Sequence, residues 1–199
     1  LMILGGIIGG ILWAMIPAIL KIRFNTNEIL VSLMLVYVAE QILALASVGF
    51  LRNPEVLGFP GSRDLSKYPS AANPELIANS GIHMGVIFSI IAVIVLTYFL
   101  IYHRLGFQIK LLGQAPKASK FSGVNSNYII IFCLGLSGGL AGVAGMFELT
   151  GPAGLINIDF NVGYGFTAII VAFLGRLHPI GILFAGLLMS LTCLLYTSD

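Results

Sequence analysis

The chain has 199 residues, of which 58% are apolar and only 9% are charged, and its mean hydropathy is +1.01. No soluble domain of this size has such a composition, so the soluble classes of protein are excluded. We expect an all-α fold, a polytopic bundle of transmembrane helices. The formal charge of +2 says little as a total, whereas the distribution of the charged residues along the chain is informative.

Six apolar runs follow one another along the chain. They cover 1–20, 29–51, 82–102, 128–149, 164–174 and 180–196. Five approach or exceed the roughly 17 to 25 residues that a crossing helix needs, whereas 164–174 is too short. Because no charged n-region or small-residue cleavage site precedes it, the first run predicts a membrane helix and not a signal peptide. We expect a single transmembrane domain over 1–196, belonging to a longer protein, with terminal residues that need not be native sequence.

The connections between these runs differ in charge. If every run crosses, the connections 21–28, 103–127 and 175–179 lie on one side and carry seven of the ten basic residues. These seven are Lys21, Arg23, Arg104, Lys110, Lys117, Lys120 and Arg176. The excess of basic residues predicts that this side is the cytoplasm, which makes the chain a multi-pass membrane protein. The proline-rich connection 52–81 is then an irregular outer loop.

The connection 103–127 contains the most informative polar segment. Its four basic residues have no Asp or Glu among them, and 113–125 reads GQAPKASKFSGVN. Pro116 favours the start of a helix and Gly123 its end, so the segment predicts one short helix on the cytoplasmic side. A basic and compactly structured loop in a membrane protein is a place where a soluble partner can dock.

Small residues recur at helical spacing in two of the apolar runs. The pairs are Gly5 and Gly9, Gly6 and Gly10, Gly135 and Gly139, Gly138 and Gly142, and Ala141 and Gly145. Such faces let helix backbones approach closely. They indicate either simple helix packing or a helix at 134–145 that slides or tilts during a transport cycle.

The segment 148–166 is rich in Gly and Asn and lies between a full apolar run and the short one. Irregular backbone at membrane depth is tolerated only where protein or a water-filled cavity covers it, which predicts a broken or re-entrant element that lines a pathway. Candidate contacts to a polar, flat solute are Glu148, Asn157, Asp159, Phe160, Asn161, Tyr164 and Phe166. The alternative is an ordinary outer loop, in which Asp159 and the asparagines form turns.

Two further carboxylates are candidates for different roles. Glu40 lies in the middle of the run 29–51, and a carboxylate inside a membrane helix is costly and usually faces the protein interior. It either lines the pathway or is a paired or protonated packing residue. Glu28 follows Asn27 and is expected at a helix start, where Asn caps the helix and Glu favours the positive end of the dipole.

Patterns typical of enzymes and metal sites do not occur in the sequence. The three histidines do not cluster, and Cys133 and Cys193 each lie within an apolar run as packing residues. No phosphate loop, nucleophile elbow or zinc-protease pair is present. We therefore expect no enzymatic activity, metal or cofactor in this chain, and any energy coupling must come from outside it.

Four segments carry a resemblance to a known family. They are FNTNEILVSLMLVYVAEQIL at 24–43, LGFQIKLLGQAPKASKFSGVN at 105–125, LSGGLAGVAGMFEL at 136–149 and GYGFTAIIVAFLGRLHPIGILFAGLLM at 163–189. In order and spacing they resemble the permease subunits of bacterial ABC importers of the branched-chain amino acid, ribose and simple-sugar group. The segments 27–35 and 175–181 are most similar to nucleoside permeases that work with basic-membrane-protein-type lipoproteins.

The resemblance implies an assembly in the bacterial cytoplasmic membrane. Two permease subunits would form the path, two cytoplasmic ATPases would bind ATP, and an extracytoplasmic lipoprotein would bind the substrate. In such importers a short cytoplasmic helix of the permease lies in a groove on the ATPase, and 113–125 is the matching segment. The expected coupling surface is Gly113, Ala115, Ala118, Ser119, Gly123 and Val124, with Lys117 and Lys120 as supporting charges.

The substrate and the energy source leave alternatives open. Nucleosides are the first expectation, because of the motif variants, and simple sugars are the second. A secondary transporter would share the broken helix and the intramembrane glutamate but would use an ion gradient. A membrane-embedded enzyme would need grouped catalytic residues, for which only the region 148–164 offers candidates.

Overall fold

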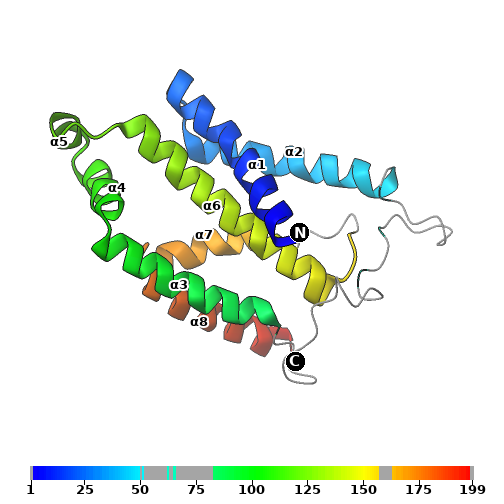
Figure 1. Cartoon of the computed structure of the whole chain (residues 1–199). Coiled ribbons are helices and arrows are strands. Elements are labelled where there is room, and N and C mark those ends of the chain that lie inside the picture. Colours follow the sequence, from blue (N-terminus) through cyan, green and yellow to red (C-terminus); the bar gives the residue numbers. More distant parts are fainter. Residues whose placement is uncertain are drawn as a thin grey trace.

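The computed structural model describes residues 2–49, 51, 62, 65, 83–156 and 163–197. Their regular elements are all helical, which agrees with the all-α prediction. The elements are α1 (Met2–Phe24), α2 (Glu28–Val48), α3 (Met84–Tyr102), α4 (Arg104–Gln114), α5 (Pro116–Phe121), α6 (Ser126–Glu148), the π-helix η2 (Leu149–Ala153), α7 (Tyr164–Leu174) and α8 (Pro179–Thr197), shown in Figure 1.

Within the described residues, four helices are long and apolar enough to cross a membrane. They are α1, α2, α3 and α6, the last of which continues into η2 to make 26 residues over Ser126–Gly151. The run 164–174 forms the 11-residue helix α7, which is as short as its sequence indicates. The run 180–196 lies in α8, whose stretch Pro179–Cys193 falls among the shorter apolar helices. Length and composition of the described residues therefore support four crossings. Helix α7 is shorter than these, whereas the whole of α8 spans 19 residues, as many as α3.

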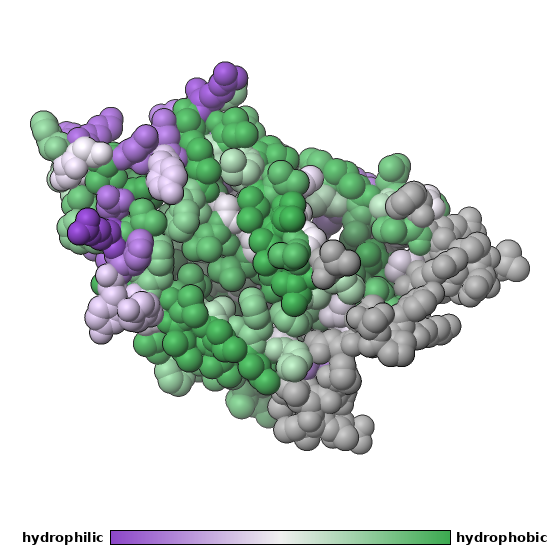
Figure 2. All heavy atoms as spheres, in the orientation of Figure 1, coloured by the Kyte–Doolittle hydropathy of each residue, from purple (hydrophilic) through white to green (hydrophobic). Residues whose placement is uncertain are grey.

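The connections with most of the positive charge lie at one end of the bundle. The α1–α2 turn, the arm formed by α4 and α5, and the α7–α8 turn are all at the left of Figure 1. Figure 2 shows hydrophilic side chains at this end and mainly apolar atoms over the flanks of the visible face. This arrangement agrees with connections that alternate between two sides of a membrane.

The main helix contact joins α1 to α6 through glycines. A Cβ atom on Gly6 would lie 2.9 Å from the carbonyl oxygen of Gly142, and one on Gly10 would overlap the backbone of Gly138. Gly5 and Gly9, in contrast, have nothing within 4 Å of such an atom. Of the small-residue pairs in α1, the structure therefore uses one for close packing and leaves the other facing outward.

The turn between α7 and α8 is tight because of its glycines. Arg176 and Leu177 have positive φ angles of 54° and 56°, and the Leu177 amide donates to the Ala172 carbonyl at 3.0 Å. A Cβ on Gly175 would lie 2.6 Å from the Cα of Ile182, so this position has no room for a side chain. The turn predicted at 175–179 is confirmed, with α7 ending at Leu174 and α8 beginning at Pro179.

Large apolar side chains are exposed along the outer faces of several helices. Leu45 on α2, Ile94 on α3 and Leu187 on α8 are among them, whereas few apolar side chains in the described residues are fully buried. An apolar surface of this extent is stable against lipid or further helices and not against water.

Candidate functional site

The short helix α5 begins and ends where its sequence predicts. Pro116 occupies the first helical turn, where its missing N–H costs no hydrogen bond. After Phe121, Gly123 takes a left-handed φ of 72°, and the Val124 amide donates to the Ser119 carbonyl at 3.1 Å. This is the geometry of a glycine-terminated helix. The polar segment is therefore an ordered element with a defined surface.

A second helix, α4, precedes α5 and is missing from the sequence-based prediction. Its start is capped by His103, whose Nδ1 accepts a hydrogen bond from the Leu105 amide at 3.2 Å. Gly106 allows α4 to fold back on α3, since a Cβ there would lie 2.7 Å from the Leu100 Cα. The spacing of Leu105, Ile109 and Leu112 was the available signal for an amphipathic helix.

The structure separates the expected coupling residues by exposure. Most are exposed, and Ala115 and Val124 are half-buried. Ser119 is fully buried, and its hydroxyl donates to the Pro116 carbonyl at 3.0 Å. Ser119 therefore stabilises the turn of α5 through this hydrogen bond, and its side chain is not part of the exposed surface. The exposed members are Gly113, Lys117, Ala118, Lys120 and Gly123.

Phe121 belongs to the exposed surface of α5, although the sequence-based list omits it. Its side chain is 94% exposed. Lys117, Lys120 and Phe121 fall on the face of α5 opposite the buried Ser119, because residues three and four apart share a helix face. An exposed aromatic ring next to two lysines is therefore the main feature of this face of α5. A phenylalanine within a polar loop was the available sequence signal.

The predicted break after α6 is present. The backbone changes from α-helix to π-helix at Leu149, and Gly154 ends the element with a φ of 66°. Thr150 is buried, and its hydroxyl donates to the Met146 carbonyl at 2.9 Å. The π-helix therefore lies at the end of α6 and is followed by non-helical backbone. The irregular element therefore follows directly from a membrane-length helix.

Two residues of the outer connection, Ser62 and Leu65, contact the chain just after η2. The Ser62 amide donates to the Ile156 carbonyl at 2.8 Å, and the Ile156 amide donates to the Ser62 hydroxyl oxygen at 2.9 Å. The Leu65 amide donates to the Gly154 carbonyl at 2.8 Å. The outer connection is therefore hydrogen-bonded to the irregular element, a pairing that the sequence does not predict.

The expected pathway residues lie on different elements. Glu148 is half-buried at the end of α6, Glu40 is half-buried on α2, and Tyr164 and Phe166 are exposed on the first turn of α7. Asn157, Asp159, Phe160 and Asn161 lie outside the described residues. The structure thus leaves the grouping of these residues into one pathway as a prediction.

An apolar cavity of about 460 Å³ lies between α1, α2 and α6. Trp13 and Pro17 of α1, Ser32 of α2 and Ser137 of α6 are among its lining residues. None of the described pathway candidates lines it. The hydroxyls of Ser32 and Ser137 and the indole N–H of Trp13 are polar groups by which it could contact a solute.

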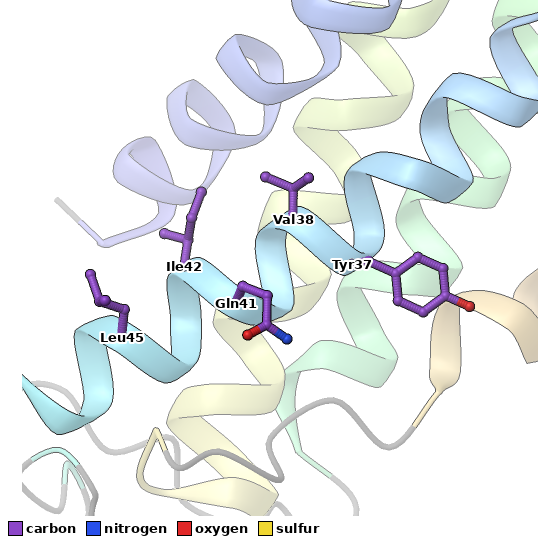
Figure 3. A pocket seen from close by; sticks show the side chains of 5 residues that line it. All are labelled: Tyr37, Val38, Gln41, Ile42 and Leu45. Carbon is purple, nitrogen blue, oxygen red and sulfur yellow. The ribbon is translucent and has the colours of Figure 1, made fainter.

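Another hollow follows a single face of α2. Figure 3 shows Tyr37, Val38, Gln41, Ile42 and Leu45, which all project from this helix. Gln41 is exposed and is a polar group within an apolar helix face. A side-chain amide on a membrane helix is favoured where another helix or a water-filled space can bond to it. This face therefore suits contact with protein or a pathway better than contact with lipid alone.

Comparison with characterised proteins gives relatives that are named as ABC transporter permease proteins. The chain is 30% identical over 198 residues to a glucose ABC transporter permease protein of Haloferax volcanii, covering 94% of this chain and 51% of the relative. It is 29% identical to a nucleoside ABC transporter permease protein of Lactococcus lactis, covering 96% and 54%. It is 27% identical to a guanosine ABC transporter permease protein of Bacillus subtilis, covering 90% and 52%.

These matches describe nearly all of this chain but only part of its relatives. The chain spans about half the length of the curated relatives it matches. No solved structure matches it. The family model described as "Branched-chain amino acid transport system / permease component" matches residues 1–198, which include the membrane-length helices. The chain therefore belongs to this family of permease components.

Proposed function

We propose that the chain is part of the membrane-embedded permease subunit of an ATP-driven importer, and that α5 couples it to an ATPase. The permease is a transport subunit and not an enzyme. ATP is bound and hydrolysed on the partner ATPase, and the permease itself needs no cofactor. Family membership and the membrane-length helices support this function.

The exposed face of α5 is the observation that carries the proposal. Lys117, Lys120 and Phe121 project from a short ordered helix at the basic end of the bundle. From residue 83 to 147 the sequence contains no Asp or Glu, so the arm formed by α4 and α5 carries positive charge and no carboxylate side chain of its own. An ATPase with a groove that accepts an aromatic ring and carries acidic residues would complement this face.

The arm is connected to the transmembrane helices at both of its ends. On one side, α4 packs closely on the last turn of α3 at Gly106. On the other side, Asn125 caps α6, with its side-chain oxygen accepting from the Asn127 amide at 3.2 Å and the Tyr128 amide at 3.4 Å. A displacement of α5 would therefore be passed to both helices, and through the glycine contact from α6 to α1.

ATP binding to the ATPase would change the conformation of the permease through the connection of α5 to α3 and α6. Closure of an ATPase dimer that binds α5 more tightly in one permease state would shift the equilibrium between inward-open and outward-open states. The size of the shift is limited by the difference in affinity for the two states. The π-helix η2 at the far end of α6 is the irregular element on which such a movement could act.

The remaining partners and the substrate complete the proposal. A second permease subunit would close the path across a bacterial cytoplasmic membrane, and an extracytoplasmic binding lipoprotein would bring a nucleoside or a simple sugar to it. The names of relatives that include glucose, nucleoside and guanosine permeases support these two substrate classes. Glu40, Glu148, Tyr164 and Phe166 are the described candidates for contacts along the path.

Uptake by the complete transporter in sealed vesicles tests this function. Uptake of a labelled nucleoside or sugar should require ATP and the ATPase, and it should continue when an ionophore collapses the ion gradients. Uptake that stops with the ionophore and proceeds without ATP would instead identify a secondary transporter.

A further inference from the structure

A groove separate from the exposed face of α5 lies where α3, α4 and the α5–α6 connection meet. Its volume is about 410 Å³. Arg104, Phe107, Gln108 and Leu111 of α4 line it, at the spacing of one helix face. Tyr102 and His103 close the end next to α3. The groove therefore combines polar groups with apolar walls.

The polar groups of the groove include several that can donate hydrogen bonds. Arg104 presents a guanidinium, Gln108 a side-chain amide and Tyr102 a hydroxyl. His103 adds its Nε2–H, because its Nδ1 accepts a hydrogen bond from the Leu105 amide. Donors gathered around a cation form a site for an anionic oxygen, and phosphate is the group that arginine suits especially well.

The apolar walls continue onto the membrane-facing surface of α3. Ile94, Tyr98 and Ile101 are exposed on this helix at intervals of four and three residues, and Ile101 also lines the groove. Tyr98 and Tyr102 pack together, with ring centroids 5.0 Å apart. Tyrosines near the end of a crossing helix are typical of headgroup depth. An occupant with a polar head and a long apolar tail would match both parts of this surface.

We propose that this groove binds an anionic phospholipid, with the phosphate at Arg104 and an acyl chain along the exposed face of α3. Phe107, which is 65% exposed, and Leu111 would contact the glycerol end of the chains. The absence of Asp and Glu between residues 83 and 147 makes the charge complementary to an acidic headgroup. Basic pockets between helices on the cytoplasmic side of membrane proteins recognise such headgroups.

A lipid explains the surface better than the soluble partner of α5 does. A cytoplasmic protein could reach Arg104 but not the apolar face of α3, which lies within a membrane-length helix. The polar head and apolar tail of a phospholipid contact both at once. The proposal depends on the membrane placement of α3 and not on the ATPase, so the two proposals can fail separately.

Retention of lipid by the assembled transporter tests the site. The protein is reconstituted in nanodiscs of phosphatidylcholine with a fixed fraction of phosphatidylglycerol, and the lipids that stay bound after release are counted by native mass spectrometry. Wild type should retain phosphatidylglycerol over phosphatidylcholine. Arg104→Gln should weaken that retention about fivefold, which corresponds to about 1 kcal/mol for one basic group near the surface.

Two variants control for charge and folding. Lys110→Gln removes the same charge from α4 but from outside the groove, and it should leave retention unchanged. Arg104→Lys keeps the charge and should retain most of the lipid. Equal losses in Arg104→Gln and Lys110→Gln, or equal retention of the two lipids by wild type, would overturn the proposal. So would cross-linking of Gln108→Cys to a co-purified subunit, because protein would then fill the groove.

Discussion

The glycine contact between α1 and α6 predicts a large difference between two neighbouring alanine substitutions. In Gly10→Ala the new Cβ would overlap the Gly138 backbone and would lie 3.1 Å from the Gly142 Cα. In Gly9→Ala the new Cβ has nothing within 4 Å. Both changes add one methyl group to the same helix and gain the same helix propensity, so the difference between them reports the packing alone.

The expected magnitude follows from the overlap with a backbone. Because backbone atoms cannot rotate away as a side chain can, α1 and α6 must separate and lose contacts along their length. Overpacking of this kind costs about 1 to 3 kcal/mol. For a chain of this size, each kcal/mol lowers the melting temperature by about 2 to 4 °C.

Thermal unfolding in one detergent, followed for wild type and both variants, measures this difference. Gly10→Ala should melt at a lower temperature than Gly9→Ala, and Gly9→Ala should melt at or slightly above wild type. Equal melting temperatures for the two variants would refute the close approach of α1 and α6 at Gly10.

The remaining predictions concern the polar end of the bundle. Gly123→Leu should abolish ATP-driven uptake while the protein still inserts, because a bulky residue at φ 72° costs about 1 to 2 kcal/mol and distorts the end of α5. Stimulation of the ATPase measures the loss of coupling, and membrane fractionation measures insertion. Ala118→Asp should abolish uptake by placing an acid on the basic coupling face, and normal transport would argue against its role. Phe121→Asp should lose uptake with an unchanged melting temperature, since the ring is 94% exposed; a lowered melting temperature would mean that the ring packs within the chain. Lys21→Met should lower the free energy of unfolding by no more than about 1 kcal/mol, because its 2.7 Å ion pair with Glu28 has partners that are 27% and 44% exposed; a larger loss in chemical denaturation would contradict a surface role.

Local signals predicted the tight turns and the limits of α5. The break near Gly154, the tight turn after Leu174 and the limits of α5 each depend on Gly or Pro, whose backbone preferences act within a few residues. The cap of α2 is likewise local, with the Asn27 side chain accepting from the Ile29 amide at 3.0 Å. Such features can be predicted from sequence because the residue that determines each turn or cap lies within a few positions of it.

Features that depend on distant contacts were not predictable. Gly5 and Gly6 offer the same spacing motif, but only the second faces α6, and this choice depends on how α1 is rotated. Ser119 and Phe121 are two residues apart, yet one is buried and the other is exposed because α5 packs on one side. Helix α4 was missed because its apolar residues are interrupted by Gly106, whose place against α3 is a tertiary contact.

Position-specific cross-linking most directly tests the central claim that α5 couples the permease to an ATPase. A photoreactive amino acid replaces either Phe121 or Phe107, which are both exposed phenylalanines of the same arm. We predict covalent adducts with the ATPase from position 121, changing in yield when ATP is added, and none from position 107. No ATPase adduct from position 121 in a complex that still transports, or equal yields from both positions, would contradict the account.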